Sequence, residues 1–123
     1  MSNDRLTLSQ MALLVAYAVG MTGGQLLFKM AALRYAEYAG GPGERFLGLL
    51  LNLYFLAALA LYAVLALLWV WILSFTPLSR AYPFVALAFA LTPLLGGLFG
   101  ETISLRLVGG ILFILCGLFL VTA

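Results

Sequence analysis

The sequence has no histidine, one cysteine and very few charged residues. Only 8% of its 123 residues are charged and 66% are apolar, whereas about a quarter of the residues in a soluble domain are charged. Cys116 lies inside an apolar run and has no second cysteine to pair with. These absences exclude a disulfide framework and a Cys/His metal cluster, so we expect no metal and no cofactor. They also predict that the solvent of this chain is mostly lipid.

The charges that are present also exclude several functions. The net charge of +2 is not gathered in a basic run, so we expect no nucleic-acid partner. No nucleophile–base pair is visible, so an enzyme is not predicted. No charge occurs between Leu6 and Phe28, a run too long for the 7–15 apolar residues or so of a signal peptide. We therefore expect the first apolar run to span the membrane.

Charges and helix breakers divide the chain into four apolar runs, each near the roughly 20 residues that a membrane span requires. The run 46–79 is too long for one untilted span and too short for two, and Pro77 places a turn at its end. The predicted helices cover residues 9–36, 46–75, 81–100 and 103–122. The expected fold is all-α: a single integral membrane domain over residues 1–123 with four transmembrane helices.

Four spans place both chain ends on one side of the membrane. Arg34, Arg45 and Arg106 fall on the side of the first and third loops, and Arg5 and Arg80 fall on the side of the termini. The positive-inside rule then favours cytoplasmic first and third loops by one or two charges. A protein that inserts in both orientations would show the same pattern.

The first helix separates polar and small residues into two stripes. Thr22, Gln25 and Lys29 share one face, and Gly20 and Gly24 lie opposite them at a spacing that lets another helix approach closely. Lys29 either extends to water from near the helix end while Gln25 bonds a neighbouring helix, or the two line a path for an anionic group. A lysine serves such a path as a mobile positive charge.

Aromatic residues recur every seven positions on the second helix, at Phe55, Tyr62 and Trp69. Such stripes are usually packing surfaces or interface anchors, and the alternative is a wall of a binding site. Tyr62 is the best candidate for such a wall, because its hydroxyl needs a partner in mid-span. Trp71 points to another side and is expected to face lipid.

The last two helices contain proline and glycine. Pro93 removes the hydrogen bond to the Phe89 carbonyl and predicts a bend, with Gly96 and Gly97 beyond it as hinge or packing positions.

In the fourth helix, Gly110 and Gly117 form a stripe that predicts a helix contact, within the chain or between two chains. We favour a dimer contact, because four short helices do not easily enclose a substrate path.

Several motifs resemble those of small four-helix members of the drug/metabolite transporter superfamily, which are EamA-like or small multidrug resistance-like. Residues 24–31 read Gly-Gln-Leu-Leu-Phe-Lys-Met-Ala, and residues 77–83 read Pro-Leu-Ser-Arg-Ala-Tyr-Pro. Residues 101–106 read Glu-Thr-Ile-Ser-Leu-Arg, followed by Gly110 and Gly117. Their order and spacing carry the resemblance across nearly the whole chain.

Two branches of that superfamily compete. In the small multidrug resistance branch a first-helix glutamate couples proton and cation binding, and Met21 stands at that place here. Tyr62 and Tyr82 match aromatic positions of its drug site. The chain is more similar to the aminoarabinose-phosphoundecaprenol flippase subunits, which share the Gln-x-x-x-Lys pattern and lack the glutamate.

That resemblance implies a dimeric flippase, or flippase subunit, of the bacterial inner membrane that moves an undecaprenyl-phosphate-linked sugar or similar polar lipid by alternating access. Its partner would be an identical chain or a paralogous four-helix subunit. Lys29 and one arginine, Arg80 or Arg106, would accompany the anion. The expected substrate path comprises Thr22, Gln25, Lys29, Tyr62, Trp69, Arg80, Tyr82 and Glu101. The alternatives are a multidrug, cation or metabolite exporter and a non-transporting membrane partner of a glycosyltransferase.

Overall fold

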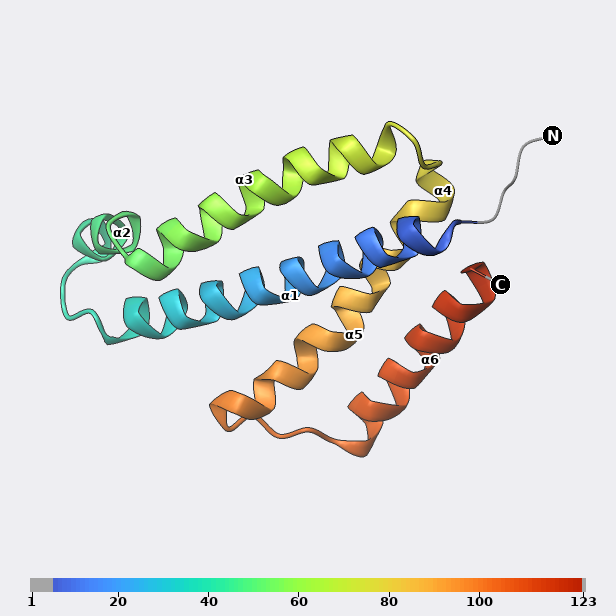
Figure 1. The fold of residues 1–123 in the computed structure, drawn as a ribbon. Coiled ribbons are helices and arrows are strands. Elements are labelled where there is room, and N and C mark those ends of the chain that lie inside the picture. The colour runs from blue at the N-terminus through green and yellow to red at the C-terminus, as the bar shows by residue number, and fades with distance from the viewer. Residues whose placement is uncertain (1–5, 123) are drawn as a thin grey trace.

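Helices make up most of residues 6–122, the part of the chain that this computed structural model describes (Figure 1). Their bounds are α1 Leu8–Glu37, α2 Pro42–Leu50, α3 Leu53–Leu73, α4 Leu78–Ala81, α5 Val85–Leu95 and α6 Leu105–Thr122. A 3₁₀ turn, η1 (Tyr82–Phe84), joins α4 to α5, and a second, η2 (Gly96–Phe99), follows α5, so that the third apolar stretch is Leu78–Phe99. Within the described range, α1, α3, this stretch and α6 are long and apolar enough to cross a membrane. The predicted all-α membrane fold with four spans is confirmed.

Local capping explains where α1 begins and ends. The Thr7 hydroxyl accepts a hydrogen bond from the Gln10 backbone N–H, and the Gln10 side chain accepts one from the Thr7 N–H. This reciprocal pair satisfies two of the N–H groups that a helix start leaves free. The helix ends at Glu37, before the Gly-Gly-Pro sequence of the first loop. It lies within one residue of the expected 9–36 at each end.

The expected single helix over residues 46–75 is wrong, because the structure divides that segment at Leu51–Asn52. The Asn52 side-chain oxygen accepts hydrogen bonds from the N–H groups of Tyr54 and Phe55 and so starts α3 as a separate helix. Pro42 starts α2 at a position where its missing N–H costs nothing. The uncharged run thus contains a standard helix-start residue in its interior.

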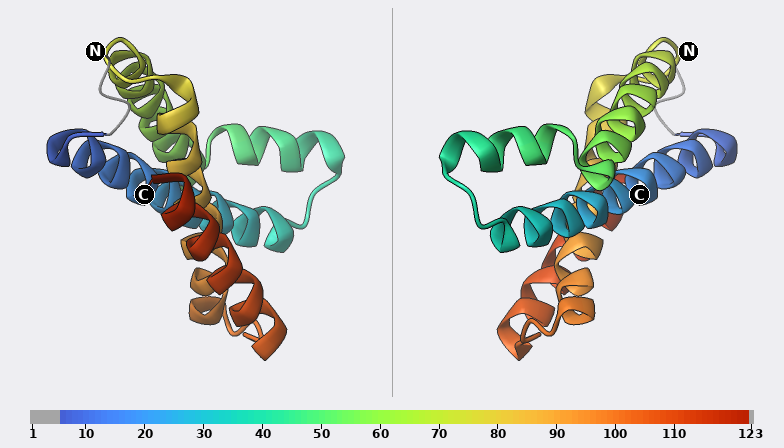
Figure 2. Two further views of the ribbon diagram at one scale, coloured as in Figure 1. Left: turned by 90° about the vertical axis from the view of Figure 1, so that its right-hand side faces the viewer. Right: turned by 90° about the vertical axis from the view of Figure 1, so that its left-hand side faces the viewer.

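The helix α2 runs across the axes of α1 and α3. It is seen nearly end-on in Figure 1 and lengthwise in Figure 2. It has a polar and an apolar side and no buried residue, and Phe46 and Leu47 on it are exposed. A short amphipathic helix that lies across spanning helices is suited to the membrane–water interface.

The four spans are arranged as a layered bundle with α1 in the middle. The helix α3 packs on one side of α1, α5 packs on the other, and α6 packs mainly on α5 (Figure 1). A small core forms near the chain ends from Leu14, Ile72, Ala81 and Phe84. Most other apolar side chains face outward, which suits lipid rather than water.

Small residues on α1 let α3 approach closely, as their spacing predicts. A Cβ atom at Gly24 would lie 2.6 Å from the Tyr62 ring, and one at Gly20 would lie 2.9 Å from a Leu65 methyl carbon. Both glycines therefore serve packing inside the chain.

The predicted seam on α6 differs from the contact on α1. Gly110 and Gly117 face open space, and Ile111 is the buried residue of that helix. Among residues 6–122 no contact forms at these two glycines, and the contact between chains stays a prediction.

Pro93 lies inside α5, as its position predicts. The helix tightens into the 3₁₀ turn η2 directly after Leu95, two residues beyond the proline. A hinge function for this segment stays a prediction.

The contact of Gly24 with Tyr62 is testable with a neighbouring control. We expect Gly24→Leu to lower the free energy of unfolding by about 1–3 kcal/mol, because the added side chain overpacks the α1–α3 contact. Gly23→Leu makes the same change beside open space and should not lower it. Thermal unfolding of the purified variants in detergent measures the difference, and equal melting temperatures would contradict the packing.

Candidate substrate-binding site

A pocket of about 440 Å³ lies between α1, α5 and the segment after η2. Three residues expected in the substrate path meet in it: Gln25 and Lys29 from α1, and Glu101 from the turn before α6. From the third span, Thr92, Pro93, Leu95, Gly96 and Phe99 line the opposite wall, and the apolar residues Leu26, Phe28 and Ala32 of α1 line the same side as Gln25 and Lys29. We call this the lysine pocket.

The charged groups of the lysine pocket form an ion pair. The Lys29 ammonium lies 3.6 Å from a Glu101 carboxylate oxygen, and the two side chains are 42% and 56% exposed. The same ammonium lies 5.9 Å from the centre of the Phe99 ring. A long, half-exposed pair is worth about 1 kcal/mol or less in water. The pair is therefore a weak contact between α1 and the segment after the third span.

The end of the third span brings Glu101 to Lys29. Gly100 has φ +78, and its N–H and the Glu101 N–H bond back to the carbonyls of Gly97 and Gly96. This is the Schellman ending of a helix, which requires a left-handed residue and favours glycine. It folds the Glu101 side chain over Gly96, where a Cβ atom would lie 3.2 Å from the carboxyl carbon. The missing side chain of Gly96 thus leaves space for the Glu101 carboxylate. The sequence predicted Gly96 only as a hinge or packing position.

Tyr62 does not line the lysine pocket, but its hydroxyl bonds the Gln25 side chain that does. The hydroxyl accepts a hydrogen bond of 2.9 Å from the Gln25 side-chain amide and donates one of 3.0 Å to the Met21 carbonyl. The Phe28 ring stacks on the tyrosine with centroids 5.3 Å apart. The partner that Tyr62 was expected to need is therefore supplied by α1. Most of the aromatic stripe on α3 packs against α1 in the same way.

The structure does not bring the other expected path residues to the lysine pocket. The Thr22 hydroxyl is buried and donates to the Ala18 carbonyl of its own helix. Trp69 stacks on Tyr17 and meets the edge of Tyr82, nearer the core at the chain ends.

Arg80 also lies near the chain ends, where it donates to the Val121 carbonyl of the last turn of α6. That bond, together with the arrangement in Figure 1, places the start of α1 and the end of α6 on one side of the bundle.

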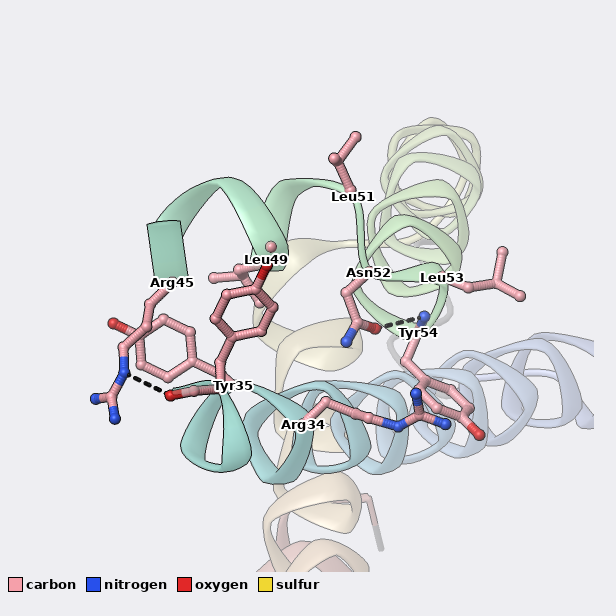
Figure 3. Close-up of a pocket in the computed structure, with 10 residues that line it drawn as sticks. Arg34, Tyr35, Arg45, Leu49, Leu51, Asn52, Leu53 and Tyr54 are labelled. Carbon is pink, nitrogen blue, oxygen red and sulfur yellow. Dashed lines mark hydrogen bonds between the residues drawn. The ribbon is translucent and has the colours of Figure 1, made fainter. Parts of the chain in front are cut away.

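A second pocket of about 440 Å³ was not anticipated from sequence. It lies where α1, α2 and α3 meet, and its polar side chains include Arg34, Arg45 and Asn52 (Figure 3). We call it the arginine pocket. Two ordinary signals point to it in retrospect, Pro42 as a helix start and Asn52 as a helix cap, because together they create α2. Without α2, Arg34 and Arg45 belong only to a polar loop.

The comparisons with known proteins give one relative and no family. A protein of Photorhabdus laumondii, named "Probable 4-amino-4-deoxy-L-arabinose-phosphoundecaprenol flippase subunit ArnF", is 37% identical over 70 residues. The match covers 54% of this chain and 56% of the relative, so it spans about half the length of that protein. No protein-family model and no solved structure matches the chain. The chain is thus similar in part to a transporter subunit, and its four spans make it a multi-pass membrane protein.

Cysteine pairs can check the geometry of the lysine pocket. In a Cys116→Ala background, Lys29→Cys with Glu101→Cys should be joined within one chain by a short bifunctional thiol reagent, because the two side chains meet. The matched pair Arg80→Cys with Glu101→Cys should not be joined, since Arg80 lies near the chain ends. Peptide mass spectrometry detects the product. Joining of the control pair but not of the first would show that Glu101 lies elsewhere.

Proposed function

We propose that the chain is a transporter subunit that flips a polar lipid with an anionic headgroup, such as an undecaprenyl-phosphate-linked sugar, across the bacterial inner membrane. The observation that carries the proposal is Lys29, a weakly paired cation in an open pocket on an apolar helix. Ionisable groups in such helices are costly and are usually retained for function. The similarity to a protein named as a flippase subunit supports the same reading.

The ion pair suggests how the pocket would accept and release its cargo. A phosphate that reaches Lys29 replaces the Glu101 carboxylate, so the ammonium exchanges one anion for another and is never left unpaired. The released carboxylate then faces water or the amine of an aminosugar. The Gln25 amide adds a hydrogen-bond donor beside the lysine. Only the headgroup needs this polar path, because the lipid tail stays in the bilayer.

A second subunit would complete the path. One chain leaves the lysine pocket open on one side, and α6 exposes a face with Gly110 and Gly117 that no part of residues 6–122 covers. Glycines on a spanning helix allow close contact with another helix. The relative is itself named as a subunit. An identical chain and a paralogous four-helix chain both suit this face, and alternating access would arise as the two halves rock.

The rival functions fit the pocket less well. A cation exporter of the multidrug type requires a free carboxylate in the path. The carboxylate in this pocket is paired with Lys29, and Met21 contributes a backbone carbonyl to Tyr62. A non-transporting partner of a glycosyltransferase would have no use for an exchangeable ion pair. In our proposal the residues of the chain bind and move a headgroup without chemical change.

Transport by proteoliposomes tests the proposal. Unmodified chain, with its partner if one co-purifies, should move a fluorescent undecaprenyl-phosphate-linked aminosugar between leaflets. Lys29→Gln should slow this movement about tenfold or more, because a charged hydrogen bond contributes about 1.5–3 kcal/mol. Lys29→Arg should keep part of the rate, and Arg106→Gln, which changes an exposed arginine outside the pocket, should keep all of it.

The outcomes separate the three functions. Full transport by Lys29→Gln would refute the anion path. Proton-driven efflux of quaternary ammonium compounds, with no movement of the lipid, would favour the exporter. No transport of either compound, with tight co-purification of a glycosyltransferase, would favour the non-transporting partner.

A further inference from the structure

The arginine pocket contains two cations without an acidic partner among the described residues. The Arg34 guanidinium lies over the Tyr54 ring at 5.7 Å, and the Arg45 guanidinium lies over the Tyr35 ring at 5.8 Å. The Arg45 Nε–H donates to the Tyr38 carbonyl. Neither arginine comes within 4.0 Å of an acid among residues 6–122. The aromatic rings and one carbonyl position the two guanidinium groups and leave their terminal N–H donors available.

The two arginines stand on opposite sides of the pocket, with Asn52 between them (Figure 3). The Asn52 oxygen is used in capping α3, so the amide still has its N–H donors. A group seated here therefore has two arginine side chains and an amide among the residues around it. Arginine binds phosphate through paired N–H donors better than any other side chain. The pocket volume of about 440 Å³ suits a phosphorylated headgroup rather than a bare phosphate ion.

An apolar hollow of about 290 Å³ adjoins the arginine pocket and shares Tyr35 and Leu49 with it. The phenyl rings of Phe28, Phe46 and Phe55 line it. A cavity with two cations beside an apolar one matches a molecule with an anionic head and a hydrocarbon chain. The amphipathic α2 and the tyrosines around the pocket are features of the membrane–water interface, where such heads lie.

We propose that the arginine pocket and its apolar hollow form a binding site for the phosphate headgroup and first chain carbons of a membrane lipid. This site is separate from the lysine pocket and does not depend on the proposed transport. The two are neighbours, because a smaller cavity lined by Arg34, Tyr54 and Phe99 shares residues with each. Lys29 lies five residues before Arg34, about 7.5 Å along α1. A lipid headgroup bound at the arginines would thus lie close to the lysine pocket.

Chemical labelling of the arginines tests the proposal on the chain without any substitution. In maltoside detergent, phenylglyoxal should modify Arg34 and Arg45 about tenfold more slowly when dodecyl phosphate occupies about nine-tenths of the sites. Arg106, an exposed arginine outside the pocket, is the internal control and should react at an unchanged rate. Peptide mass spectrometry follows each arginine separately. Inorganic phosphate and butyl phosphate at the same concentration should protect neither pocket arginine, because they cannot fill the apolar hollow.

Each other result overturns the proposal. Equal protection by inorganic phosphate would indicate a site for a free anion, and equal protection of Arg106 would indicate general adsorption of the detergent-like probe. No protection would exclude the site. As a second measurement, dodecyl phosphate should raise the melting temperature of the unmodified chain and of Arg106→Gln, but not that of Arg34→Gln with Arg45→Gln. A full shift in the double variant would contradict the assignment.

Discussion

The ion pair between Lys29 and Glu101 links the parts of the protein that matter for function. Lys29 belongs to the central helix α1, and Glu101 belongs to the segment that joins the third span to α6. In a lipid-facing protein an ionisable group requires a partner or water, and this pair provides the partner. The pair also keeps the lysine pocket close to neutral. Gly100, which adopts the left-handed conformation, ends the third span and reverses the chain so that Glu101 faces Lys29.

The protein has two pockets of similar volume that differ in how their cations are paired. The lysine pocket lies beside α5 and combines an ion pair with a mostly apolar lining. The arginine pocket lies under α2, with two cations lacking an acidic partner among residues 6–122 and an apolar annex. The two pockets therefore present different charged groups on neighbouring parts of α1.

The sequence predicted the spans well because apolar runs and breakers act locally. The first helix, the turn at Pro77 and the apolar last helix all depend on neighbours within a few residues. The break at Asn52 was not predicted, because the length of an apolar run does not show whether a helix starts inside it. Asn52 caps α3 through bonds to Tyr54 and Phe55, and this local rule was sufficient to find it.

The site was predictable only in part, because its members are brought together by contacts between helices. Gln25 and Lys29 share a helical face, so their common pocket follows from spacing. The position of Glu101 beside Lys29 depends on the left-handed conformation of Gly100 and on the packing of α5 against α1. Neither of these can be predicted from the periodicity of the sequence. Arg80 was expected to accompany the anion, but it caps the end of α6 instead. Thr22 lies on the predicted stripe, but its hydroxyl is used by its own backbone.

The central claim is that Lys29 serves the cargo through its charge at that position on α1, and not only through the pair that it forms. A charge exchange tests this most directly: Lys29→Glu combined with Glu101→Lys keeps an ion pair but places an acid on the central helix. Movement of an anionic undecaprenyl-phosphate-linked sugar is then measured in proteoliposomes, with circular dichroism to establish that the variant is folded. We predict a folded protein that does not move the lipid. Transport at the unmodified rate by the exchanged pair would contradict the account.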